Sequence, residues 1–240
     1  MFLEDVGLPS DAAAEELISC SPVLQVLKIC LCKYDSVVAL RVCSLSLKSF
    51  TLKRMEPRYS RGHSVLIDAP KLGCLSLTDY YHFSSFEITS VADSFKVDID
   101  VEFELMSDYL MEMKIIYNLL KNFSGVTKMT ISWKTLEELL IHYPEVIARL
   151  STVLSRCLVS SLESVEMECP VTEIATELDL ARYFMKNSTT LKKLVLRLNQ
   201  SSTGEKHRPG VLDQLIESPR LSSLCQFEVI PVVPISESFV

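Results

Sequence analysis

LQVLKI at residues 24–29, LKSFTL at 47–52 and LGCLSL at 72–77 all place apolar residues at the first, fourth and sixth positions. The three segments begin 23 and 25 residues apart. An apolar pattern of this kind with a period of about 20–29 residues is typical of leucine-rich repeats. Each unit forms a short strand, whose apolar side chains are buried only when neighbouring units stack against it. The segments therefore predict a sheet of stacked parallel strands.

The same pattern continues through the rest of the chain with a longer step. Its further copies lie at 94–99, 126–131, 162–167, 191–196 and 224–229. Steps between the later copies are 29 to 36 residues, and helix-like segments fill the extra length. We therefore predict an α/β leucine-rich-repeat solenoid, a curved parallel sheet of short strands with helices and irregular turns on its outer side. The alternative is a generic β-rich domain in which the leucine spacing is coincidental.

Several segments between the strands have the apolar spacing of helices. Asp11 is expected to cap a helix that ends at Ser19, with Ala14, Leu17 and Ile18 on one face. The other predicted helices are Ser107–Asn122, Pro144–Leu154, a helix that follows a variant capping box at Thr176 and Asp179, and a helix between Pro209 and Pro219 with Leu212, Leu215 and Ile216 inward. The polar stretch 199–209 predicts a loop.

Composition and charge argue against several classes of protein. The 240 residues include 31 acidic and 24 basic side chains, so the formal net charge is -7, and such a chain is a poor general binder of nucleic acid. Six glycines are too few for a protein built on glycine-rich phosphate loops. The longest stretch without a charged residue, 17–27, is shorter than a membrane span and contains a proline, so no membrane insertion is expected.

The amino terminus and the cysteines predict the compartment. The opening residues MFLEDVGLPS have neither the basic nor the apolar region of a signal peptide. Eight cysteines are scattered along the chain, and we interpret them as reduced thiols in a protein of the cytosol or nucleus. Cys30 and Cys32 share one face of a predicted strand, which could place both thiols on an open surface. Without a C-x-x-C pair, no metal site is predicted there.

Three blocks of the sequence share a pattern with one known family. The first is EELISCSPVLQVL at 15–27. The second joins GHSVLIDAPKLGCLSLTDY at 62–80 to FKVDIDVEF at 95–103, and the third joins CLVSSLESVEM at 157–167 to ATELDLARYFMKNSTTLKKLVLRL at 175–198. Together they resemble the plant F-box/LRR/FBD proteins. The resemblance implies the substrate-recognition part of an SCF-type ubiquitin ligase.

This resemblance divides the chain into three parts. Residues 1–155 form a leucine-rich-repeat region, 156–232 an FBD-like domain that continues the sheet as a C-terminal cap, and 233–240 a loose tail. Members of the family begin with an F-box, a helical module that docks on the adaptor subunit of the ligase. No F-box is expected before Glu15, because FLEDVGL at 2–8 resembles the end of a repeat strand. We therefore expect the SCF adaptor as a partner only if an F-box is supplied upstream, and the target protein is unknown.

The candidate partner surface contains charges of both signs. Four carboxylates alternate with apolar residues, so in a strand they project from one face. They predict either an acidic recognition strip for a basic partner or a solvated face that prevents edge pairing. Two basic residues of the FBD-like block are expected on the surface. The carboxylates are Asp98, Asp100, Glu102 and Glu104, and the basic residues are Lys193 and Arg197.

A local basic cluster and the absence of catalytic motifs complete the prediction. The cluster at residues 48–63 predicts either an anion-binding pocket or, with more weight, a solvated loop. Its members are Lys48, Lys53, Arg54, Arg58, Arg61 and His63. No spacing matches a catalytic motif, and no cofactor or metal is predicted. The sequence therefore predicts a non-catalytic protein-interaction module. A truncated or decoy fragment without a ligase role is the alternative, and an enzyme of unknown type is a weaker one.

Overall fold

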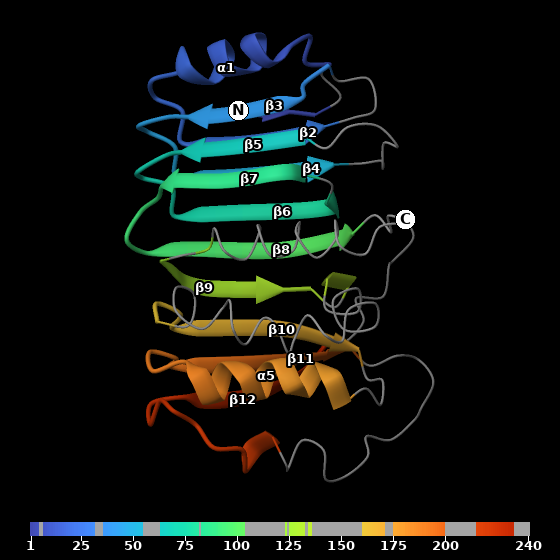
Figure 1. The fold of residues 1–240 in the computed structure, drawn as a ribbon, viewed down its shortest axis with the longest axis vertical. Coiled ribbons are helices and arrows are strands. Elements are labelled where there is room, and N and C mark those ends of the chain that lie inside the picture. Colours follow the sequence, from blue (N-terminus) through green and yellow to red (C-terminus); the bar gives the residue numbers. More distant parts are fainter. Residues whose placement is uncertain are drawn as a thin grey trace, which may run out of the picture.

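One long parallel sheet runs through the computed structural model from end to end (Figure 1). The structure describes residues 1–4, 7–31, 36–54, 63–81, 83–103, 123, 125–132, 134–135, 160–170, 175–199 and 215–232. The strands of the long sheet, in spatial order, are β1 (Phe2–Leu3), β2 (Val26–Leu31), β4 (Ser49–Arg54), β6 (Cys74–Tyr81), β8 (Phe95–Phe103), β9 (Val126–Ile131), β10 (Ser164–Pro170), β11 (Lys193–Asn199) and β12 (Gln226–Val232). Each pairs in parallel with its neighbours.

Apolar side chains form two continuous ladders on one face of this sheet. We call it the inner face because it points into the core, and it is the face on which the helices of the solenoid were expected. The fourth residues of the predicted repeats lie side by side from Leu27 to Phe227, and the sixth residues do the same from Ile29 to Val229. Between Leu27 and Leu194, no member of the first ladder is more than 2% exposed. All eight predicted strands are present, and they share one register.

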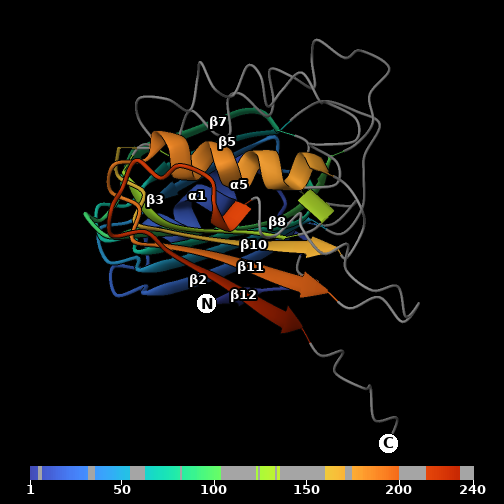
Figure 2. The ribbon, with the colours of Figure 1, turned by 90° about the horizontal axis from the view of Figure 1, so that it is seen from below.

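A second parallel sheet covers the inner face in the N-terminal half (Figure 2). Its strands are β3 (Ala39–Cys43), β5 (His63–Asp68) and β7 (Phe83–Ser90). The prediction of helices and irregular turns at this place is wrong. The steps between repeats here are 22 to 25 residues. After the main strand and two turns, such a step leaves room for a short strand, and segments such as HSVLID are rich in residues that favour strands.

A helix covers the inner face in the C-terminal half, where the step between repeats is longer. Helix α5 (Ala175–Asn187) lies on the same side of the long sheet as β5 and β7 (Figure 2), and it buries Leu180 and Phe184. This helix was predicted, but its capping box is wrong. Thr176 is already the second residue of α5, and the Asp179 carboxylate pairs with Arg182 at 2.7 Å.

Helix α1 (Asp11–Ser19) lies at the N-terminal end of the molecule (Figure 1) and begins one residue earlier than predicted. Ser10 is the N-cap, because its backbone is extended and its hydroxyl accepts a hydrogen bond from the Ala13 amide. Asp11 instead accepts a hydrogen bond from the Val38 amide at 2.6 Å. Of the three residues predicted to share one face, Ala14 and Ile18 are buried, whereas Leu17 is 38% exposed.

The remaining helix predictions fall largely outside the described residues. Those at 107–122 and 144–154 lie wholly outside them. Near the last predicted helix, Leu215 is buried, but Ile216 is 49% exposed, so its predicted inward position is wrong.

Hydroxyl side chains fasten neighbouring repeats, a feature that the sequence analysis missed. Ser46 donates to the Leu24 carbonyl at 2.8 Å, Ser161 to the Val126 carbonyl at 3.0 Å, and Thr190 to the Leu162 carbonyl at 2.9 Å. Each donor directly precedes the first apolar residue of its own repeat, and each acceptor is the first residue of the repeat before it. A Ser or Thr directly before the first apolar residue of a repeat could have predicted these hydrogen bonds from the sequence.

A buried hydroxyl joins the end of β8 to the segment that follows β9. The Val101 amide donates to Thr135 Oγ1 at 2.8 Å, and Thr135 Oγ1 donates to the Val101 carbonyl at 2.9 Å. Thr135 is 2% exposed, and its amide donates to the Ser132 hydroxyl. The side chain thus satisfies backbone groups of β8 that no paired residue of β9 reaches.

Candidate functional site

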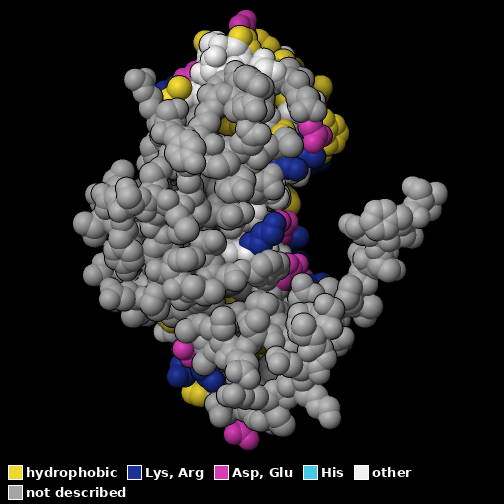
Figure 3. Space-filling view, turned by 90° about the vertical axis from the view of Figure 1, so that its right-hand side faces the viewer, with side chains coloured by type: hydrophobic (Ala, Val, Ile, Leu, Met, Phe, Trp, Pro, Cys, Tyr) yellow, Lys and Arg dark blue, Asp and Glu magenta, His cyan; other side chains and the backbone are white. Residues whose placement is uncertain are grey.

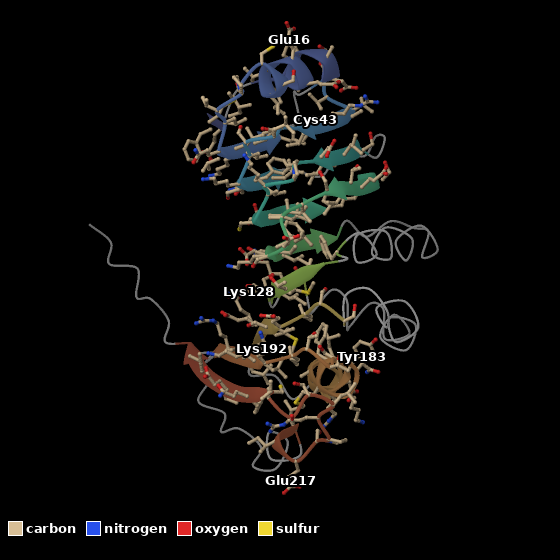
Figure 4. All side chains as sticks on the ribbon, turned by 90° about the vertical axis from the view of Figure 1, so that its left-hand side faces the viewer. Glu16, Cys43, Lys128, Tyr183, Lys192 and Glu217 are labelled. Carbon is tan, nitrogen blue, oxygen red and sulfur yellow. The ribbon has the colours of Figure 1, made fainter. Side chains whose placement is uncertain are left out.

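The face of the long sheet turned away from α5 and from β3-β5-β7 is the candidate interaction surface, and we call it the outer face. Figure 4 shows Lys128 of β9 on this side and Tyr183 of α5 on the other. No described helix or strand covers the outer face (Figures 1 and 2). In Figure 3, basic and acidic side chains gather along the hollowed edge of the molecule.

Strand register arranges the outer-face side chains of the C-terminal half in rows across the strands. The first row pairs Lys96 with Lys128, and then runs through Ser164 to Lys193. The next row contains Asp98, Glu166 and Glu228. We call the outer-face residues of β8 to β12 the charged face; its charged members are Lys96, Asp98, Asp100, Lys128, Glu166, Glu168, Lys193, Arg197 and Glu228.

The N-terminal half presents a different outer face. In the same rows, β4 and β6 place Ser49 beside Cys74, and Thr51 beside Ser76. These four groups are small and uncharged at neutral pH, so they offer hydrogen bonds rather than ion pairs. The same face also carries Lys53 on β4 and Lys28 on β2, and Lys28 Nζ lies 3.7 Å from Glu4 Oε2.

Most of the basic residues on the charged face are already paired within the chain. Lys96 Nζ lies 3.1 Å from Asp98 Oδ1, and Lys193 Nζ lies 2.9 Å from Glu228 Oε2. The Arg197 guanidinium donates to the Glu166 carboxylate. Burial disfavours the charged form of Lys96, but the hydrogen bond and the charge of Asp98 outweigh it and raise the pKa of the Lys96 ammonium group.

Two of these ion pairs surround an apolar residue on the outer face. Val195 lies between Lys193 and Arg197 along β11 and between Glu166 and Glu228 across the strands. It is only 4% exposed, although it points away from the core ladders. The aliphatic stems of the four charged neighbours account for this burial.

The predicted acidic strip is divided by the structure. Asp98 pairs with Lys96, whereas Asp100 is exposed and forms no ion pair within the described residues. Glu102 belongs to β8 by its backbone, and Glu104 lies outside the described residues. Lys193 and Arg197 are half-exposed as predicted, and each has an acidic partner. The sequence analysis missed Lys128, an exposed cation on β9 without an ion pair among the described residues.

Cysteines and candidate metal ligands give no second site in the described part of the chain. Cys30 is buried at 3% exposure, so its predicted place on an open surface is wrong, and Cys32 lies outside the described residues. No group of three His, Cys, Asp or Glu side chains that could hold a metal ion occurs among the described residues. In the same residues, no helix is long and apolar enough to span a bilayer.

The basic cluster predicted at 48–63 lies only partly within the structure. Lys48 is exposed beside β4, and Lys53 is half-buried within that strand. Arg58 and Arg61 lie outside the described residues, as do the side chains of Arg54 and His63. The anion-binding pocket therefore stays a prediction.

Residues 152–196 match the FBD domain family. This segment contains β10, α5 and most of β11, and so it includes the Arg197 partner Glu166 and the buried Tyr183. Burial raises the pKa of the Tyr183 hydroxyl. The division of the chain at residue 156 stays a prediction.

Two curated relatives are similar to nearly the whole chain. An F-box/FBD/LRR-repeat protein of Arabidopsis thaliana is 54% identical over 98% of this chain and 60% of its own length. An FBD-associated F-box protein of the same plant is 40% identical over 96% of this chain and 64% of its own length. The chain thus spans less than two thirds of the length of these relatives. No solved structure matches the chain.

The first relative carries additional residues inside the matched stretch. The comparison covers 287 positions, and 98% of this chain is about 235 residues, so about 50 positions have no counterpart here. That length is close to two of the short repeat steps in the N-terminal half. The shared pattern, the FBD match and the similarity to both relatives agree, and the chain belongs to the plant family of FBD/LRR-repeat proteins.

Proposed function

We propose that this chain is a non-catalytic protein-interaction module, a leucine-rich-repeat solenoid whose charged face binds a partner protein. The observation that carries the proposal is a broad face, formed by five parallel strands in register, that no described element covers. Its ordered rows of charge provide specificity, because a partner with the wrong charge pattern meets like charges. In a cell, we place this activity in the cytosol or nucleus.

Two groups on the charged face are the first points of contact that we propose. Lys128 and Asp100 are exposed, and neither has an ion pair within the described residues. The other basic residues named above are held by acidic neighbours, so a partner must displace or join an existing pair to use them. A partner with an acidic group opposite Lys128 and a basic group opposite Asp100 fits this face without breaking a pair.

The names of the relatives support a role in substrate recognition. Both names contain F-box. In the family that the sequence resembles, the F-box is the module expected to dock on the adaptor of an SCF-type ubiquitin ligase. We propose that this chain corresponds to the recognition part of such a protein. The alternative is a decoy or fragment that binds targets without delivering them to a ligase.

Proximity labelling in plant cells tests the interaction surface. The wild-type chain is compared with Lys128→Glu and with Lys186→Glu, which makes the same charge change at an exposed position of α5 on the other side of the sheet. We expect a set of labelled proteins that Lys128→Glu loses and Lys186→Glu retains. Equal labelling by all three proteins would exclude the charged face as the binding surface.

A binding measurement with the purified SCF adaptor distinguishes a substrate receptor of the ligase from a module that binds targets without delivering them. We expect no binding by this 240-residue chain, since none of its repeats corresponds to the docking module. Firm binding would show that a segment of this chain replaces the F-box. It would support a role as a ligase receptor that needs no added F-box. Absence of binding together with a labelled target set would support a module that recognises targets and is not itself recruited.

A further inference from the structure

The C-terminal end of the sheet leaves exposed an apolar residue that is buried in the other repeats. Leu224 is the first apolar residue of the last repeat, and it is 70% exposed. The residues at the same position of five earlier repeats are 0% exposed, and they are Leu47, Leu72, Val126, Leu162 and Leu191. In a solenoid, such a position is buried by stacking of the next repeat. No described residue follows β12.

Other exposed apolar side chains lie in the same terminal segment as Leu224. Leu221 is 55% exposed and Ile216 is 49% exposed. Arg220 holds the segment in place, because its guanidinium donates to the carbonyls of Cys225 and Ile216. Figure 4 shows Glu217 of this segment at the extreme end of the molecule, opposite Glu16. The exposed residues therefore form an ordered apolar end, and we call Ile216, Leu221 and Leu224 the terminal patch.

The free edge of β12 has a specific set of backbone donors and acceptors. The Gln226 amide donates to the Lys192 carbonyl, so Gln226 faces β11, and alternate residues along the strand do the same. Phe227, Val229 and Pro231 consequently face the free edge. Pro231 has no amide hydrogen, so it is tolerated there, and it removes one donor from the edge.

We propose that β12 pairs with β12 of a second copy of this chain, antiparallel and centred on Val229. In this register, the two Val229 residues exchange two hydrogen bonds, and each Phe227 amide donates to the Pro231 carbonyl of the other copy. Pro231 has no amide to return a bond to the Phe227 carbonyl, so four hydrogen bonds join the two strands instead of six. A two-fold axis relates the copies, so the contact closes as a dimer.

The charges and the sequence at the edge of β12 favour a second copy of this chain as its partner. Glu228 is paired with Lys193 of its own chain, and the register places it opposite Ile230 of the second copy, so like charges do not face each other. Antiparallel pairing also sets the start of one β12 beside the end of the other. The start carries Leu221 and Leu224, and the sequence at the end of the strand is the apolar run IPV at 230–232.

Sedimentation velocity of the purified full chain tests the dimer. We expect a mass of about twice 27.1 kDa at the higher concentrations for the wild type. Leu224→Lys, which places a charge in the terminal patch, is expected to weaken association at least tenfold. Leu45→Lys is the matched control, because Leu45 is 78% exposed in the N-terminal half, far from β12, and it should dimerise as the wild type does.

A second variant addresses the backbone directly. Val229→Pro removes the outward amide at the centre of the proposed register and no bond to β11, and it is also expected to give monomers. Far-UV circular dichroism confirms that each variant is folded.

Several outcomes would overturn the proposal. They are a wild-type chain that is monomeric at every concentration, a mass that keeps rising beyond the dimer, and equal association of the Leu224→Lys and Leu45→Lys variants. A chain that dimerises only after residues 233–240 are deleted would show that its own tail occupies the edge, which also overturns it. None of these measurements depends on the target-binding role proposed above.

Discussion

The two halves of the molecule carry the same apolar ladders and cover them by different means. In the N-terminal half, β3, β5 and β7 form a second parallel sheet behind β2, β4 and β6. In the C-terminal half, α5 lies between β10 and β11 in the chain and packs behind them. The number of residues between strands accounts for the difference, because a step of 22 to 25 residues accommodates a strand and a step of 29 or more accommodates a helix. Repeat length therefore selects the covering element, while the ladder stays unchanged.

The outer faces of the two halves differ as well. Hydroxyl and thiol groups predominate on β4 and β6, with Lys53 as a charged residue, whereas charged residues, most of them paired, occupy β8 to β12. The inner face must satisfy packing in every repeat, but the outer face has no such constraint. It is therefore the face on which repeats can differ in chemistry without loss of the fold.

The largest expected effect tests whether the second sheet and helix α5 contribute equally to the stability of the fold. Phe50 lies under the second sheet at 0% exposure, and Phe184 belongs to α5 at 1%. Phe50→Ala and Phe184→Ala should each lower the free energy of unfolding by about 3–5 kcal/mol, since each leaves a cavity in the shared core. Urea denaturation followed by circular dichroism measures both. A loss below about 1 kcal/mol for one variant alone would show that its half contributes little to the core.

An intermediate effect is expected at the contact between β8 and the segment that follows β9, next to the second sheet's half of the molecule. Thr135→Val keeps the shape of the side chain but removes the hydroxyl that serves both the Val101 amide and the Val101 carbonyl. Leaving these buried groups unsatisfied should cost about 1–3 kcal/mol. Hydrogen exchange of the Val101 amide should accelerate together with the loss of stability. An unchanged hydrogen-exchange rate at Val101 would show that its amide does not donate to the Thr135 hydroxyl.

A smaller effect should appear at alkaline pH. Burial, followed by the charges of Asp68 and Asp98 respectively, raises the pKa of the Cys43 and Cys74 thiols above the ordinary value of 9.0, and burial raises that of Cys225. The folded chain therefore holds these protons more tightly than the unfolded chain does. Their contribution to stability is complete below pH 9.0 and is lost as the pH rises through the higher folded-state values.

Thermal unfolding measured from about pH 7 to above pH 9 checks that stability falls as the pH rises. The melting temperature should be level between about pH 7 and 8, and should fall above pH 9, by about 2–4 °C for each kcal/mol lost. Cys74→Ala should reduce the slope, whereas Cys20→Ala, at an exposed thiol, should leave it unchanged. A melting temperature that rises above pH 9 would contradict the assignment.

The smallest effect is expected for the ion pairs of the charged face. Arg197 and Glu166 are 38% and 30% exposed, so solvent screens their attraction. A double-mutant cycle with Arg197→Ala and Glu166→Ala should give a coupling energy of about 0.2–1 kcal/mol. The Lys193 and Glu228 pair serves as the comparison, with a similar value expected. A coupling energy above about 2 kcal/mol would make this face a structural element rather than a free recognition surface.

The positions of all eight strands could be predicted from the sequence, and the reason is physical. An apolar residue at the fourth and sixth positions of every repeat has to point inward, and stacking then forces these residues into one register. Helix α5 was predictable as well, because its apolar residues recur at helical spacing between two predicted strands.

The sequence by itself thus determined the inner ladders and the order of the strands, since both follow from periodicity along the chain. Only the tertiary structure decided which element covers each half, which acidic residue each base contacts, and which repeat has no described neighbour on one side. Arg197 meets Glu166 across strands that are 31 positions apart, a contact set by the register of β10 and β11. Leu224 fits the repeat pattern as well as Leu191 does, yet it is exposed, because burial of a repeat depends on a neighbour that its own residues do not specify.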